Sequence, residues 1–417
     1  MRVDQSPSEP GPFLPPDWGG LQYTGDVRRS NAAKRVLKRI GSAVKWLGVS
    51  LICIEALSFV AVTAANFILL GHAREGSRAV YDPYTFFLQS DGPRATAYNC
   101  VSADSRKNRV IWMLGGSTMR GATDSDDKTI ASVVSQFLNS GEPRFHVTVK
   151  NYGMNSFNSL LEAKYLQKLL IENDDHPDII VFYDGANDAK YYAEHRHPYS
   201  HHGFRRASGL IESYYKSWLG LFKPLNAALY TSFTRELYNK LNQVLIPIDP
   251  DSPELRKWVD GVVRRYRYVD KIAQCYGASF VLLWQPLWWV EECDLPQELK
   301  HKEQSLIMRS EKLTATRENF TVPYEALAEK LRHEPYFLNL RYALCKRTTA
   351  VYKPDGVHLN DEGRKIMGIR IGRILEKRLQ EMDGTIRSEQ GSEPLHRSRS
   401  LCLSDGDAGS AAGRRLR

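Results

Sequence analysis

One long apolar segment limits what this chain can fold into. Residues 46–70 read WLGVSLICIEALSFVAVTAANFILL, and Glu55 is the one charged residue among these 25. A helix of that length can cross a bilayer with some tilt. The carboxylate costs roughly 2.5–3.5 kcal/mol at the centre of a membrane helix, and the large apolar side chains around it can offset that cost. The segment therefore predicts one transmembrane helix; the alternative is a buried core helix of a soluble protein.

Positive charges on the N-terminal side of this segment predict its orientation. They are Arg28, Arg29, Lys34, Arg35, Lys38, Arg39 and Lys45. Because basic residues stay on the cytoplasmic side, we expect a cytoplasmic N-terminus and a single pass through the inner membrane. The large C-terminal part would then be periplasmic or otherwise extracytoplasmic. The segment is longer, and lies further from the N-terminus, than a typical cleaved signal peptide.

Composition allows an ordinary folded domain beyond this helix, since 42% of the residues are hydrophobic and 25% are charged. The net charge is +9, but much of the excess lies before the apolar segment and in the C-terminal tail. We therefore expect no nucleic-acid partner. The sequence divides into a basic cytoplasmic tail (1–45), a transmembrane anchor (46–70), a connector (71–104), one α/β domain (105–383) and a disordered polar tail (384–417).

Six cysteines are present and none forms a CxxC pair, so no zinc or redox motif is indicated. Cys53 lies in the apolar segment and Cys402 in the tail. The other four, which are Cys100, Cys275, Cys293 and Cys345, can form disulfides in an exported domain or remain buried thiols. The sequence does not fix their pairing.

Strand-like and helical runs alternate along the domain. Strands are predicted at 110–114, 145–152, 178–183 and 278–287, and helices at 129–138, 156–171, 253–276 and 360–379. This alternation predicts a parallel sheet with helices on both faces. The polar sequences GGST, NYGMNS and DGAND each follow a strand directly. Because active sites form at the carboxyl ends of such strands, these three loops are expected to build one site.

Ser117 and His358 are a candidate nucleophile and its base. Ser117 follows two glycines at a predicted turn from strand to helix, and His358 follows Asp355 by three residues in KPDGVHLN. A histidine can take the serine proton while an aspartate holds its ring in the useful tautomer. Alone, each motif has an ordinary alternative: a helix N-cap for the serine, and a surface loop for the DxxH pair.

Three groups are candidate donors to an oxyanion: the side chain of Asn187, the backbone N–H of Gly153 and the backbone N–H of Ser117. Asn187 lies in DGAND after the third strand, and Gly153 lies in NYGMN after the second. Asn and Gly also favour tight turns for purely structural reasons. Asp184 and Asp188, which flank Asn187, are expected to stabilise or position this turn.

The four blocks together resemble the SGNH (GDSL-like) hydrolases, whose sequence blocks carry Ser, Gly, Asn and His in that order. Ser117, Gly153, Asn187 and His358 fill those places, and Asp355 is at the aspartate of the DxxH block. The resemblance covers roughly residues 105–380. It implies a flavodoxin-like α/β/α sandwich and acyl-group chemistry without a cofactor. One departure is Gly116, which replaces the aspartate of GDS; this variation looks like branches that act on carbohydrate esters.

These features predict a membrane-anchored serine esterase that hydrolyses an O-acyl ester of a small molecule or an envelope polysaccharide. The alternatives are an O-acyltransferase with the same site and a non-catalytic carbohydrate-binding protein. Four histidines, at positions 195, 197, 201 and 202, raise the question of a metal site. Their spacing matches no metal motif, so we expect no metal there and interpret the segment as a loop.

Overall fold

The computed structural model describes residues 23–70, 79–104, 107–121, 123, 125–141, 143–216, 229, 232–243, 247–307 and 313–390. The chain divides into two compact units, Met1–Val62 and Thr63–Arg417. The predicted disorder of the C-terminal tail beyond residue 390 lies outside the described residues.

The N-terminal unit contains most of a single long helix, α1 (Tyr23–Leu70). Its part Lys34–Ala64 contains an 18-residue window with a mean hydropathy of 2.1. Among the described residues it is the one helix long and apolar enough to cross a membrane. The helix predicted at 46–70 is therefore confirmed. It begins well before residue 46 because the basic stretch ahead of it, rich in Arg, Lys and Ala, also favours helix.

The larger unit is built on a five-stranded parallel sheet with strand order β4-β3-β5-β6-β7. The strands are β3 (Asn108–Gly115), β4 (His146–Asn151), β5 (Ile179–Asp184), β6 (Ser279–Trp284) and β7 (Phe337–Asn339). Every residue of the central strand β5 is buried, whereas burial alternates along the edge strand β4. A strand covered on both faces by helices needs apolar side chains on both. The predicted parallel α/β sheet is confirmed.

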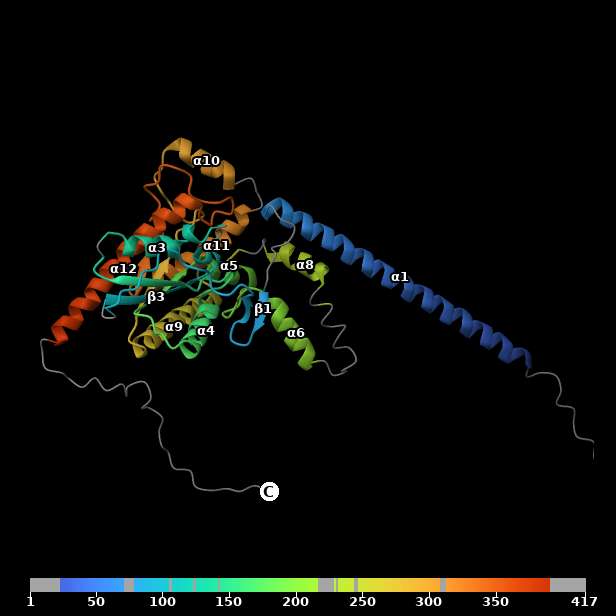
Figure 1. Ribbon diagram of the computed structural model, residues 1–417. Helices are drawn as coiled ribbons and strands as arrows, with labels where there is room; N and C mark the ends of the chain where they lie inside the picture. The colour runs from blue at the N-terminus through green and yellow to red at the C-terminus, as the bar shows by residue number, and fades with distance from the viewer. Residues whose placement is uncertain are drawn as a thin grey trace, which may run out of the picture. The chain divides into compact units, whose positions relative to one another are not determined.

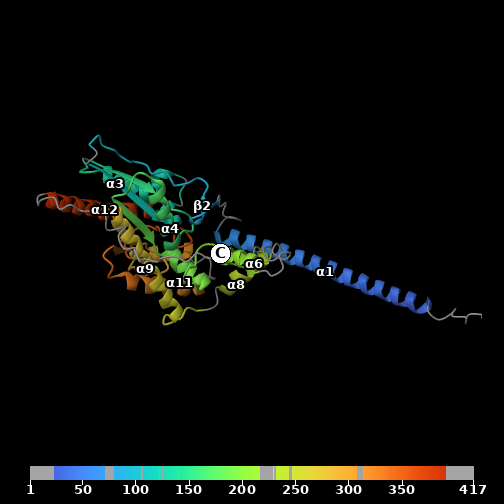
Figure 2. The same cartoon turned by 90° about the horizontal axis from the view of Figure 1, so that it is seen from below.

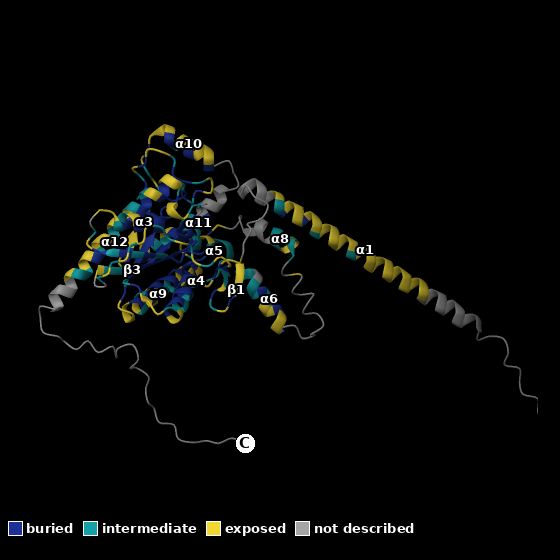
Figure 3. Ribbon diagram, viewed as in Figure 1, coloured by how far each residue is buried: buried dark blue, intermediate teal, exposed yellow. Residues whose placement is uncertain are grey.

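Helices cover both faces of this sheet. Figures 1 and 2 show α3 (Ile130–Asn139) and α12 (Asp361–Gln390) on one face, and α4 (Ser159–Glu172) and α9 (Pro253–Cys275) on the other. Figure 3 shows the buried core between these layers. The short α2 (Ser117–Arg120) follows β3, and α5 (Ala186–His195) follows β5. The remaining elements are η2 (Asp126–Lys128), α6 (Phe204–Lys216), α8 (Phe233–Gln243), α10 (Gln297–Ile307) and α11 (Leu313–Leu331).

Helix α12 begins where it was predicted to begin but extends further at its C-terminal end. Asn360 is its N-cap, because its Oδ1 accepts from the backbone N–H of Gly363 at 3.0 Å. Its C-terminal end lies at Gln390, beyond the helix end predicted at residue 379, so residues 384–390 are helical and not disordered as predicted. The sequence there contains no proline, so nothing stops the helix at the point where its apolar face ends.

The described part of the predicted connector packs on the domain. It forms an antiparallel hairpin, β1 (Ala79–Asp82) and β2 (Phe86–Gln89), whose Asp82 pairs with Lys168 on α4. Further along, the guanidinium of Arg94 donates to the carbonyl of Gly121 at 2.6 Å and to that of Thr123 at 2.7 Å. The stretch from β1 to Arg94 is therefore tied to the segment that follows α2.

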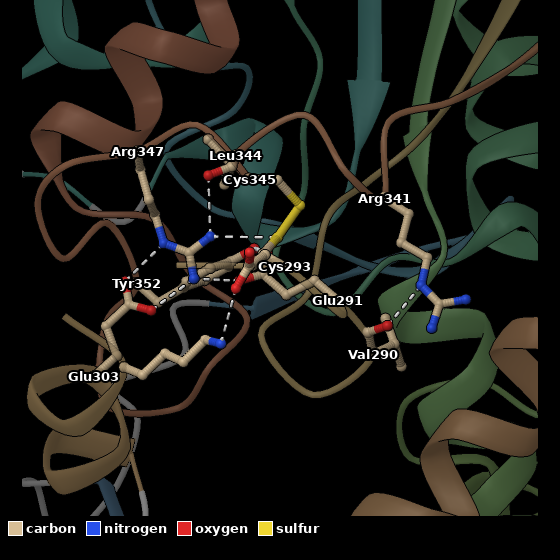
Figure 4. Close-up of a disulfide and its surroundings, with 11 residues drawn as sticks. Val290, Glu291, Cys293, Glu303, Arg341, Leu344, Cys345, Arg347 and Tyr352 are labelled. Carbon is tan, nitrogen blue, oxygen red and sulfur yellow. Dashed lines mark hydrogen bonds and ion pairs between the residues drawn. A yellow bond between two sulfur atoms is a disulfide. The ribbon is translucent and has the colours of Figure 1, made fainter. Parts of the chain in front are cut away.

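Cys293 and Cys345, which are 52 residues apart in the sequence, form a disulfide (Figure 4). This bond settles one of the cysteine pairings that the sequence leaves open. Cys53 and Cys100 are free thiols. The bridged cysteines lie after β6 and after β7, so the disulfide closes the stretch of chain that contains α10, α11 and β7.

Candidate active site

The candidate nucleophile lies at the carboxyl end of β3. The strand ends at Gly115, and Ser117 is the first residue of α2 after the single residue Gly116. A Cβ atom added to Gly116 would lie 2.4 Å from Nδ2 of Asn187. Glycine at 116 therefore lets the amide of Asn187 pack beside the serine, and any larger residue would displace it.

Ser117, His358 and Asp355 are joined by two hydrogen bonds. Oγ of Ser117 lies 2.7 Å from Nε2 of His358, and Nδ1 of His358 lies 2.6 Å from Oδ2 of Asp355. An ionised aspartate only accepts, so Nδ1 carries a proton and donates a hydrogen bond to Asp355. In neutral imidazole Nε2 is then the acceptor, and the hydroxyl of Ser117 donates to it.

The carboxylate of Asp355 is itself fixed by its own turn. Its Oδ1 accepts from the backbone N–H groups of Val357 and His358, both at 2.9 Å. Burial raises the pKa of Asp355, but the hydrogen bonds from the ring and backbone of His358 and from Val357 outweigh it, so the pKa lies below its ordinary value of 3.8. Asp355 is therefore ionised at neutral pH, and the 42% exposure of its side chain also favours the charged form.

Gly153 and Asn187 lie on either side of the serine's segment. A Cβ atom at Gly153 would lie 2.4 Å from the backbone nitrogen of Arg120 and 2.8 Å from the carbonyl carbon of Met119, so only glycine fits against α2. Its N–H donates to Oδ1 of Asn151 at 3.0 Å. As an oxyanion donor, Gly153 would have to share or release that hydrogen bond.

The amide nitrogen of Asn187 donates to the carbonyl of Phe157 at 2.6 Å. That bond uses one of the two N–H groups of the carboxamide and sets the plane in which the other lies. Asn187 belongs to α5, directly after β5, whereas Phe157 precedes α4. The predicted block residues Ser117, Gly153 and Asn187 are thus brought to one edge of the sheet, and His358 reaches the same place from the loop before α12.

A buried acidic group lies beneath the turn of Asn187. Asp184 accepts from the hydroxyl of Tyr266 at 2.9 Å, and Asp188 accepts from the hydroxyl of Ser159 at 2.6 Å. Burial, together with the nearby charge of Asp188, raises the pKa of Asp184 to about 7. The flanking aspartates thus hydrogen-bond to α9 and α4 from buried positions, so their bonds join neighbouring helices to the segment of Asn187.

Glu162 on α4 completes this group and was missed by sequence reasoning. It is buried, and burial followed by the charge of Asp184 raises its pKa well above the ordinary value of 4.5. The charge of Asp188 adds to the same shift, so Glu162 belongs electrostatically to this buried acidic group. Inside a helical pattern, Glu162 gives no sequence signal that it faces the sheet.

The histidine segment packs against aromatic rings. His201 stacks on Phe86 with ring centroids 5.3 Å apart, and His197 stacks on Phe204 at 4.5 Å. Burial lowers the pKa of His195 to about 4, so its ring is neutral at physiological pH. In the part of the chain that the structure describes, no group of three or more His, Cys, Asp or Glu residues is arranged to hold a metal ion.

Comparison with solved structures finds similar folds among acylhydrolases, lipolytic proteins of the G-D-S-L family and acetylxylan esterases. A lipase/acylhydrolase from Enterococcus faecalis shares 17% identity with a TM-score of 0.35, and covers 65% of this chain and 96% of its own. A member of the lipolytic protein G-D-S-L family from Veillonella parvula shares 10% identity with a TM-score of 0.32. The match covers 62% of this chain and 91% of the Veillonella chain. An acetylxylan esterase from Geobacillus stearothermophilus shares 12% identity with a TM-score of 0.32. The match covers 64% of this chain and 93% of the esterase. No protein-family model and no curated protein sequence matches the chain.

Proposed function

We propose that this protein is a serine esterase that hydrolyses an O-acyl ester through Ser117, His358 and Asp355. The observation that carries the proposal is the unbroken pair of hydrogen bonds from Ser117 Oγ through the imidazole to Asp355, at 2.7 and 2.6 Å. A serine that serves only as a helix cap does not need a histidine on its hydroxyl, nor a carboxylate behind that histidine.

In the proposed first half-reaction, Oγ of Ser117 attacks the ester carbonyl while Nε2 of His358 takes the hydroxyl proton. Negative charge develops on the carbonyl oxygen, and donors from Ser117, Gly153 and Asn187 stabilise it. The tetrahedral intermediate collapses, the ester C–O bond breaks, and His358 returns its proton to the leaving alcohol. Asp355 stays ionised throughout and stabilises the imidazolium that forms transiently.

Water completes the second half-reaction. His358 removes a proton from a water molecule, whose oxygen attacks the acyl-enzyme and releases the carboxylic acid and free Ser117. If a sugar hydroxyl took the place of water, the same residues would make an ester, and the protein would be an O-acyltransferase. Both reactions share the acyl-enzyme, so they are separated by their products.

We propose an acetylated polysaccharide of the cell envelope as the substrate, with an acylated small molecule as the other candidate. The sequence resemblance supports this choice through Gly116, which stands where lipase-like members carry an aspartate. The Cys293–Cys345 disulfide supports a location outside the cytoplasm, because such bonds persist in oxidising compartments. We propose that α1 anchors the domain there, with the N-terminus in the cytoplasm; a signal sequence would have a similar apolar core.

The test is hydrolysis of 4-nitrophenyl acetate and of acetylated xylan by the full-length protein in detergent, beside S117A and H358A. We expect turnover by the parent and a loss of at least about 10³-fold in both variants. Adding a sugar acceptor distinguishes hydrolysis from transfer by the product formed. A folded parent that cleaves no ester, transfers no acyl group and binds glycan as well as S117A would instead indicate the non-catalytic alternative.

A further inference from the structure

Two tryptophans hold the turn of Asp355 from outside. The indole N–H of Trp289 donates to the carbonyl oxygen of Asp355 at 2.9 Å, and the backbone N–H of Trp288 donates to that of Gly356 at 3.0 Å. Two consecutive carbonyls of the turn are therefore bound by two consecutive residues of the segment after β6.

Gly356 lies directly on the indole of Trp289. Its φ is +68°, and a Cβ atom added to it would lie 2.7 Å from Nε1 of Trp289. The ring of Trp289 is buried, so it cannot move aside into solvent. The indole therefore sets how far the turn can approach the core, and with it the position of the carboxylate that holds His358.

The segment that carries Trp289 is tied to the loop that leads into the catalytic turn. Four residues after Trp289, Cys293 forms its disulfide with Cys345. Between them, the carbonyl of Val290 accepts from Nε of Arg341 at 2.6 Å (Figure 4). The segment of residues 289–293 is therefore joined to residues 341–345 by one covalent bond and one hydrogen bond to a charged group.

Buried charges reinforce this connection. Arg347 forms ion pairs with Glu291 and Glu303, and all three side chains are at most 3% exposed. Tyr352, three residues before Asp355, donates its hydroxyl to Glu291 at 2.7 Å. Figure 4 shows the guanidinium lying between the two carboxylates beside the disulfide. Glu291 thus belongs to the same short segment as Trp289 and bonds to the loop that enters the turn.

We propose that Trp289 is a positioning residue for Asp355 and His358, and that the Cys293–Cys345 disulfide is required to keep it in place. The inference rests on the proposed function. With the disulfide formed, the segment of Trp289 cannot shift relative to the loop that leads to Asp355. Without it, the indole can withdraw, the turn loses its contacts, and the imidazole no longer meets Ser117 and Asp355 together. The site would then become active only in an oxidising compartment.

The first test replaces Trp289 and measures an activated serine directly. In the full-length protein, the maximal rate of modification by a fluorophosphonate and its half-saturating concentration are measured from pH 5 to pH 9. We expect W289F to lower the maximal rate about tenfold or more with the half-saturating concentration unchanged, because misplacement by about 1 Å is enough for such losses. The acid limb of the pH profile should move to lower pH, because a histidine less well paired with a carboxylate releases its proton more readily.

The matched control is W258F. Trp258 is also buried, but it lies on α9, where its ring stacks on Tyr192 at 4.6 Å. This variant removes the same atoms from the core without touching the turn, so parental rate and pH profile are expected. G356A tests the same contact from the other side and should resemble W289F. Circular dichroism shows which variants are folded.

The second test removes the disulfide as C293S/C345S, with C100S as control because Cys100 is a free thiol. A reductant is unsuitable because Cys275 is also disulfide-bonded. We expect the double variant to follow W289F in rate and pH profile, and C100S to follow the parent. Parental rates in W289F, or in the folded double variant, would overturn the proposal.

One further measurement separates this proposal from the proposed function. The Nδ1 proton of His358 gives a downfield proton signal when it is strongly bound to a carboxylate, and H358A assigns that signal. A parent that is not labelled contradicts the esterase, whereas the signal still reports the pairing of Asp355 and His358. Loss of the signal in W289F supports the positioning role; its retention in W289F and in C293S/C345S overturns it.

Discussion

Gly116 and Asn187 are in contact across the carboxyl ends of β3 and β5, so closely that a Cβ atom on Gly116 would lie 2.4 Å from the amide nitrogen. The same amide donates to Phe157 at 2.6 Å. Two contacts from different elements therefore fix the group that we propose to bind the oxyanion. Such fixed donors stabilise developing charge without having to reorganise during the reaction.

G116A is expected to lower kcat about 10²–10³-fold, as loss of one oxyanion donor does. The backbone of Gly116 has φ −75°, which alanine adopts freely, so the effect comes from displacing Asn187. Hydrolysis of 4-nitrophenyl acetate measures it. G261A is the control, since a Cβ atom at Gly261 on α9 meets nothing within 4 Å. Parental kcat in G116A would show that Asn187 does not act where we place it.

D355N is expected to lower kcat about 10³–10⁴-fold, because an asparagine can present an N–H to the imidazole and so stabilise the wrong tautomer. Ester hydrolysis at neutral pH measures the loss. D361N is a suitable control because Asp361 is also three residues before a basic partner, Arg364, but lies on α12 outside the proposed set. An equal, small effect of both substitutions would contradict the role of Asp355.

The stability contributed by Asp355 is expected to depend on pH in the acid range. Its pKa is lowered in the folded protein, so the carboxylate stabilises the fold fully above its unfolded value of 3.8 and loses that contribution as pH falls through the folded pKa. The difference in free energy of unfolding between parent and D355N should therefore shrink below about pH 3.8. Urea unfolding at pH 6 and pH 3 measures it. A difference that grows on acidification would contradict the lowered pKa.

With E162Q, the free energy of unfolding is expected to fall less steeply as pH rises than it does in the parent. The pKa of Glu162 is raised in the folded protein, so above pH 4.5 the unfolded chain releases a proton that the folded chain keeps. The free energy of unfolding of the parent should then fall by up to about 1.4 kcal/mol per pH unit from this group, until it ionises. Urea unfolding of parent and E162Q between pH 5 and pH 8 compares the slopes. Identical slopes would show that Glu162 is ionised in the fold.

Removing the disulfide is expected to destabilise the domain by roughly 2–4 kcal/mol, since a bond across 52 residues restricts the unfolded chain considerably. Thermal and urea unfolding of C293S/C345S measure the change. C100S should unfold like the parent because Cys100 has no disulfide to lose. An unchanged midpoint in the double variant would mean that the ion pairs of Arg347 alone hold these loops.

The parallel sheet and the site blocks could be predicted because their signals are local. Val110 to Leu114 is an apolar run followed at once by glycines and Ser117, and the segment around Val181 is followed at once by DGAND. In a parallel sheet every such loop lies at the same edge, so strand ends alone bring Ser117 and Asn187 together. The contact between Asp355 and the ring of His358 was also predictable, because the two residues are only three positions apart in the DxxH sequence.

The contacts that support the site could not be predicted, because they join residues far apart in the sequence. Trp289 and Asp355 are 66 residues apart, and no sequence motif in either segment indicates that the two residues are in contact. Glu162 occupies a helical position whose neighbours depend on how α4 packs. The hairpin before Arg94 has only four-residue strands, too short for a periodic pattern to stand out.

The central claim, that Ser117 is an activated nucleophile, is tested most directly by fluorophosphonate labelling of the full-length protein, with the adduct located by mass spectrometry of its peptides. We predict one phosphonyl group on Ser117 of the parent, none on S117A and strongly reduced labelling of H358A. A well-folded parent that carries no adduct, or one that carries it on another residue, would contradict the account.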